Sequence, residues 1–239
     1  MNSSRWRVAA VVGLGLVLAA ATPLSAQWEV QADVMSRYIW RGFDLYPNNH
    51  PAFQPSLTYS AGESGFSFNF WASFALAERS IYQEFDEIDI TLDYAFSPAE
   101  GIDMSVGFIQ YGYYFMKDFD FKDSTTQEIY ISAGLPDVFL APALTAYYDF
   151  NLGSGLYLLL EGSHSIALSE SVGLDISAGL GYNSRQFIEE SGFSDLTIGA
   201  SLPVKLGGWT IAPRVCYTFV FLEAVNDENE FWFGISLYR

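Results

Sequence analysis

The sequence has very few of the residues that build thiol-based or histidine-based sites. It contains one cysteine, Cys216, and two histidines. A single cysteine excludes an intrachain disulfide and a cysteine-based metal site. The loop carboxylates Asp118, Asp120 and Asp123 lack the glycine and the terminal glutamate of a calcium loop. We therefore expect no metal and no cofactor.

Positive charge is also scarce. The chain has 11 lysines and arginines against 28 aspartates and glutamates, which gives a net charge of −17. Such acidity argues against nucleic acid as a partner and against anionic surfaces. It suits solvated loops, or a water-filled interior that attracts cations.

Long hydrophobic runs are missing after the first residues. No later segment approaches the eighteen or so apolar residues that a transmembrane helix needs. At the start, Arg5 and Arg7 precede an apolar run over residues 8–21 and a stretch of small residues that ends at Ala26. This pattern predicts a cleaved signal peptide at 1–26 and one domain at 27–239.

What the chain does have is strict alternation of apolar and polar residues. Between residues 88 and 96, the apolar positions are even and Asp89, Thr91, Asp93 and Ala95 stand between them. Alternate side chains of a strand point to opposite faces, so such a segment has one apolar face and one wet face. Behind an export signal, this pattern is typical of an outer-membrane barrel that is apolar outside and wet inside.

The alternation recurs in about twelve segments. They are predicted at 28–43, 53–61, 65–77, 85–96, 102–115, 126–135, 143–152, 155–167, 172–182, 193–204, 209–222 and 231–239. Short links alternate with longer polar ones, as in barrels with periplasmic turns and outer loops. Two links fit less well, because 136–142 is long for a turn and 153–154 is short for an outer loop. The predicted fold is an all-β, antiparallel, up-and-down transmembrane barrel.

One stretch near the start carries a family resemblance. Ser36, Tyr38, Arg41 and Gly42 form an S-x-Y-x-x-R-G core that resembles the opening of the TorF-type porins, small Gram-negative outer-membrane barrels. The resemblance implies an outer-membrane channel whose solute is generally undefined. The last segment, 232–239, resembles the signal that barrel-insertion machinery recognises, although Tyr238 is penultimate and Arg239 is last.

Charged residues of the polar parity are the candidate lumen residues. Arg37 and Arg41 from the first predicted strand, with Arg214 near the barrel closure, are expected to form a basic stripe. The stripe would face an acidic wall of Asp89, Asp93, Asp103, Glu128, Asp149, Glu161, Asp175 and Asp195. Rings of acidic side chains favour cations. The alternative is that these charges are solvated, or paired to stiffen the barrel.

Aromatic residues near strand ends suit the headgroup girdles of such barrels. Tyr38 and Trp40 are among those expected there, and an aromatic track that binds sugars or nucleobases by stacking is the alternative. Catalysis has thin support, because His164 and its neighbours Ser163 and Ser165 would point to opposite faces of one strand. No catalytic residue is assigned.

The sequence therefore predicts a porin-like channel for passive diffusion of small polar solutes or ions, with a preference for cations. We expect a monomer in the outer membrane of a Gram-negative bacterium, in contact with lipid and lipopolysaccharide. An outer-membrane lipid-modifying enzyme and a non-conducting structural or adhesion barrel are the alternatives.

Overall fold

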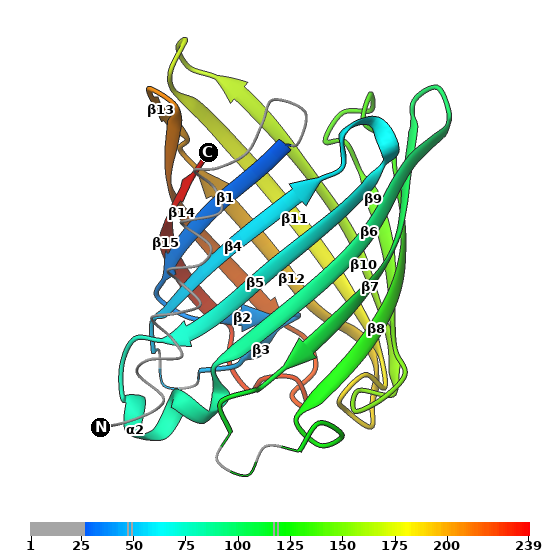
Figure 1. Cartoon of the computed structure of the whole chain (residues 1–239), viewed down its shortest axis with the longest axis vertical. Helices are drawn as coiled ribbons and strands as arrows, with labels where there is room; N and C mark the ends of the chain where they lie inside the picture. Colours follow the sequence, from blue (N-terminus) through cyan, green and yellow to red (C-terminus); the bar gives the residue numbers. More distant parts are fainter. Residues whose placement is uncertain (1–26, 47, 49, 117, 119) are drawn as a thin grey trace.

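In the computed structural model, residues 27–239 are described except for 47, 49, 117 and 119. The predicted signal peptide at 1–26 lies outside the described residues. Twelve strands form the wall of a closed antiparallel barrel (Figure 1), which confirms the predicted fold. They are β1 (Gln27–Met35), β4 (Ala52–Ser60), β5 (Phe66–Ala75), β6 (Glu87–Ala99), β7 (Ile102–Gly112), β8 (Thr125–Gly134), β9 (Ala143–Asp149), β10 (Gly155–Ala167), β11 (Gly173–Ser184), β12 (Ser191–Ser201), β14 (Trp209–Val220) and β15 (Glu230–Tyr238).

Smaller elements lie at the two ends of the wall. A short strand, β13 (Val204–Leu206), pairs with the start of β14. The hairpin β2 (Ile39–Trp40) and β3 (Phe43–Asp44) forms a separate two-stranded sheet. Single turns of helix occur at η1 (Gly62–Ser64), α2 (Arg79–Tyr82) and η2 (Gln83–Phe85). No helix in the described part of the chain is long and apolar enough to cross a membrane.

The wall closes because its first and last strands pair. Each strand neighbours the next along the sheet, and β1 pairs with β15 in antiparallel register, with Asp33 opposite Ser236. Closure leaves no wall strand with an unpaired edge, which hydrocarbon would penalise by several kcal/mol per backbone group. The beginning of β1 and the C-terminus lie at the same end of the barrel (Figure 1). We call this the terminal end, and the opposite one the loop end.

The distribution of side chains is inside out relative to a water-soluble protein. Phe66 and Phe231 on the outer face are 61% and 54% exposed, whereas Asp89 and Glu128 on the inner face are 8% and 0% exposed. Soluble proteins bury apolar groups and rarely bury charges. An apolar exterior around a polar interior is the arrangement that a bilayer stabilises, so the barrel belongs in an outer membrane.

The alternation at 88–96 has the predicted sides. Leu92 is 52% exposed on the outer face, and Asp93 accepts a hydrogen bond from Tyr130 on the inner face. Gln110 breaks the alternation of its own strand, β7, and lies on the outer face. Its amide group forms hydrogen bonds with nearby residues. Its Nε2 donates to two backbone carbonyls, and Gln127 Nε2 on the next strand donates to its Oε1 at 3.0 Å.

Candidate functional site: the lumenal hairpin

The first wall strand is much shorter than the sequence predicts. A strand over 28–43 is wrong, because β1 ends at Met35. Ser36 continues the hydrogen bonding to β15 by one residue: its N–H donates to Phe233 O at 2.8 Å, and its Oγ accepts from Phe233 N at 2.9 Å. Beyond it the chain turns inward and crosses the barrel as the β2–β3 hairpin (Figure 1). We call residues 39–44 the lumenal hairpin.

A tight turn at Arg41 and Gly42 forms the tip of the hairpin. Both residues have positive φ, 51° and 87°, and Trp40 pairs directly with Phe43 across them. A two-residue turn with positive φ at both central residues has a twist that matches the right-handed twist of the flanking strands. Positive φ favours glycine. A Cβ on Gly42 would lie 2.9 Å from Val225 Cγ1 and 3.1 Å from Asp195 Cβ, so the tip packs closely against β12 and the β14–β15 loop.

Arg41 is held by a buried ion pair with the opposite side of the barrel. Its two terminal nitrogens donate to the two carboxylate oxygens of Glu128 on β8, at 2.6 and 2.9 Å. Gln186 from the β11–β12 loop accepts from Arg41 and donates to Glu128. Tyr111 donates to Glu128 at 2.8 Å. Bidentate pairing with extra hydrogen bonds is the geometry in which a buried ion pair is best compensated for lost hydration.

Three aromatic rings surround the same guanidinium. The Arg41 Cζ lies 4.4, 4.3 and 4.7 Å from the ring centroids of Trp40, Tyr147 and Tyr157. A desolvated cation is attracted to ring faces at such distances. The Arg41 side chain is only 7% exposed. Its charge is therefore neutralised where it stands, and it does not add a free cation to the lumen.

The base of the hairpin is also inside the barrel. Tyr38 donates its hydroxyl hydrogen to Glu87 at 2.8 Å, and its ring contacts Trp71 and Tyr46. Burial, reinforced by the carboxylates of Glu87 and Asp89, raises the pKa of Tyr38, so the hydroxyl keeps the proton that it donates. The expectation that Tyr38 and Trp40 lie in an exterior girdle is wrong, because both pack in the interior.

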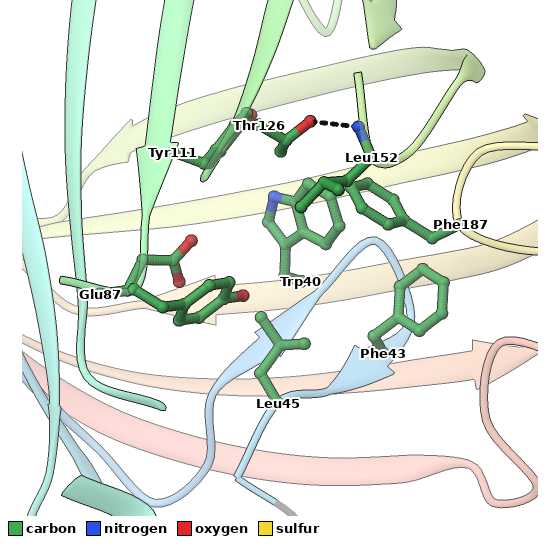
Figure 2. Close-up of a pocket in the computed structure, with 9 residues that line it drawn as sticks. Trp40, Phe43, Leu45, Glu87, Tyr111, Thr126, Leu152 and Phe187 are labelled. Atoms are coloured by element: carbon green, nitrogen blue, oxygen red, sulfur yellow. Dashed lines mark hydrogen bonds between the residues drawn. The ribbon is translucent and has the colours of Figure 1, made fainter. Parts of the chain in front are cut away.

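The hairpin divides the lumen into two spaces. Toward the loop end a cavity of about 160 Å³ is lined mainly by apolar and aromatic side chains. Figure 2 shows Trp40, Phe43, Leu45 and Phe187 converging on it, with Glu87 at one side. Phe187 comes from the β11–β12 loop and contacts Trp40 edge to face at 5.8 Å. Aromatic and apolar side chains therefore pack against this side of the hairpin.

Toward the terminal end a larger cavity of about 760 Å³ lies beneath Arg41. We call it the chamber. Its lining combines a carboxylate of β10, Glu161, with hydroxyls and aromatic rings of the wall. The further members that matter here are Trp40, Arg41, Tyr147, Tyr157, Ser163, Ser177, Asp195, Thr197 and Trp232.

The other predicted lumen residues are dispersed along the inner wall. Arg37 forms an ion pair with Glu230, and Arg214 donates to Ser236 at 2.9 Å. Asp175 accepts from Ser201 at 3.4 Å. Arg37 and Arg41 both follow the C-terminal end of β1 in the chain, and each of them is paired with a carboxylate. The predicted basic stripe with Arg214 is therefore wrong in its placement: Arg41 lies across the lumen, against the acidic wall.

The serine–histidine neighbourhood on β10 is split between two environments. Ser163 lines the chamber, whereas His164 packs against Phe139 with ring centroids 5.2 Å apart. The alternation of the strand puts these side chains on opposite faces of the wall.

Sequence reasoning missed the hairpin and, with it, the partners of Arg41. Glu128 was expected in the lumen but not as that partner, and Gln186 gave no signal because it lies in a loop. One clue was present. A strand of 28–43 is longer than the nine to eleven or so residues that cross a bilayer in a barrel. The Arg-Gly pair between Trp40 and Phe43 fits a two-residue hairpin turn.

Comparison with solved structures supports the fold. A KdgM porin superimposes with a TM-score of 0.56 at 11% identity, over 88% of this chain and 97% of that one. A NanC porin gives 0.51 at 11% identity, over 88% and 98%. The COG4313 outer membrane channel from Pseudomonas putida F1 gives 0.50 at 10% identity, over 92% and 96%. At such identities the likeness concerns the fold alone.

Sequence comparison assigns the family. Among curated proteins none matches this chain. The model of the Gcw_chp family, described as bacterial proteins of unknown function, matches residues 20–228. This stretch includes the lumenal hairpin and all wall strands but the last. The chain is a member of the Gcw_chp family.

Proposed function

We propose that this protein is an outer-membrane channel for passive diffusion of small polar solutes or ions, with the lumenal hairpin as its narrowest point. The observation that carries the proposal is the chamber of about 760 Å³, lined by both polar and apolar side chains, inside a closed wall. The likeness to porin and channel barrels and the resemblance of Ser36, Tyr38, Arg41 and Gly42 to the TorF-type porins support it.

The pairing of Arg37 and Arg41 with carboxylates supports the proposal of a preference for cations. Arg37 and Arg41 are neutralised by Glu230 and Glu128. Asp195 accepts hydrogen bonds from the neutral donors Tyr157 and Ser194 and has no ion pair within the described residues. Carboxylates that face water without a counter-cation make the local potential negative and favour cations.

A non-conducting structural barrel is the second candidate. It is favoured by the aromatic side chains that pack around Arg41 and line a cavity of about 160 Å³ on the side toward the loop end. In both cases we propose that residues 1–26 direct export and are removed. The mature barrel would be a monomer that contacts outer-membrane lipid.

Single-channel recording separates the two candidates. The mature chain is refolded, inserted into planar bilayers and studied in a potassium chloride gradient. The channel proposal predicts discrete conductance steps and a reversal potential of the sign for cation selectivity. Silent bilayers, with insertion verified by protease protection, would favour the non-conducting barrel. Conductance with anion selectivity would refute the cation preference alone.

A further inference from the structure

The chamber has the chemistry of a binding site for an organic cation. Its lining includes one guanidinium, Arg41, and two carboxylates, Glu161 and Asp195. The guanidinium is already paired with Glu128. Within the described residues neither Glu161 nor Asp195 has an ion pair, so the lining holds carboxylates without a paired cation.

Glu161 is the carboxylate that a solute can reach. It belongs to β10 and sits opposite Gly179 on β11 and Ala143 on β9, two neighbours with no polar side chain. Within the described residues Glu161 has no hydrogen bond and no ion pair, and it is exposed to the lumen. Because glycine has no side chain and alanine has only a methyl group, neither neighbour offers a side-chain hydrogen bond to the Glu161 carboxylate.

Aromatic faces complete the site. Trp232 on β15 lines the chamber, and its indole N–H is anchored by a 3.1 Å hydrogen bond to Thr218 Oγ1. Its ring makes no ring–ring contact within the part of the chain that the structure describes. The face of an indole ring attracts a cation through its quadrupole. Tyr147 and Tyr157, which also line the chamber, already make this cation–π contact with the guanidinium of Arg41.

We propose that the chamber binds small organic ammonium ions, with Glu161 as the counter-charge and Trp232 as an aromatic wall. The inference deepens the proposed function and rests on it, because it names the solute class of the same lumen. The volume of about 760 Å³ lies within the range of small-molecule sites. A carboxylate together with aromatic faces selects an alkylammonium over an anion and over a neutral solute of equal shape.

A matched pair of probes tests the charge requirement. Choline and its uncharged carbon analogue, 3,3-dimethylbutan-1-ol, have nearly the same shape. Each is titrated into the refolded, detergent-solubilised barrel at constant ionic strength, and binding is followed by intrinsic tryptophan fluorescence, because Trp40 and Trp232 line the chamber. We expect choline to bind roughly tenfold more tightly than the analogue.

Two variants locate the site. Glu161→Gln should remove most of the advantage of choline, while Glu63→Gln, the same change in the exposed turn after β4, should leave it intact. Equal affinity for the two probes, no binding of choline, or full binding by Glu161→Gln would each overturn the proposal. Heat-dependent migration on gels confirms that each variant is folded.

The result of the choline experiment can be distinguished from the result of the conductance experiment that tests the channel proposal. A barrel that binds choline through Glu161 but never conducts keeps this inference and refutes the channel. A barrel that conducts but does not distinguish the two probes keeps the channel and refutes this inference.

Discussion

The two carboxylates Glu128 and Glu161 face the same lumen from neighbouring parts of the wall, yet their surroundings are opposite. Glu128 is fully buried and accepts hydrogen bonds from Arg41, Tyr111 and Gln186. Glu161 is exposed and has no partner within the described residues. Glu128 therefore takes part in the contacts that hold the lumenal hairpin, whereas Glu161 does not. Under our proposal Glu161 remains available to a solute.

The largest effect on stability is expected at Glu128. The Glu128→Ala change leaves Arg41 buried without its counter-charge, which costs about 3–5 kcal/mol when a buried pair is broken. Glu161→Ala, the matched change in the chamber, should alter stability by no more than about 0.5 kcal/mol. Urea unfolding of both variants in lipid vesicles measures the two values. Similar losses for both would remove the distinction between a structural and an available carboxylate.

A smaller loss is expected at Gly42. In Gly42→Ala a side chain must adopt a φ near 87°, and its Cβ must fit beside Val225 and Asp195. Strain of this kind costs about 1–3 kcal/mol. Because displacing the hairpin costs less free energy than disrupting the wall, we expect the Gly42→Ala variant to have a higher conductance than the wild type. The same urea unfolding and bilayer recordings serve here, and an unchanged midpoint with unchanged conductance would show that the tip is not tightly held.

The wall was predictable and the hairpin was not, for one physical reason. A period of two along the chain specifies which side chains share a face, and a closed barrel follows from the requirement to pair every strand edge. The same period continues through Tyr38 and Trp40, although the chain has left the wall after Met35. Alternation does not distinguish lipid from a packed protein interior, because both accept aromatic rings.

The partners of Arg41 could not be predicted from the alternation of polar and apolar residues, for a related reason. Parity assigns Glu128 and Arg41 to the lumen, but the distance between them depends on how far the chain reaches across the barrel. The outward pair Gln110 and Gln127 is a similar case, because a local hydrogen bond between two side chains compensates for a break in parity. Such compensation depends on register, which the sequence leaves open by one or two residues.

Excision of the lumenal hairpin tests the central claim most directly. Leu45 N donates to Tyr38 O at 2.9 Å, so the ends of residues 39–44 lie close enough to be joined by two glycines. Single-channel conductance of this variant is compared with that of the wild type in the same bilayer and salt. An occluding hairpin above a cation-preferring chamber predicts a several-fold rise in conductance with cation selectivity retained. Equal conductance in the two proteins would contradict the account.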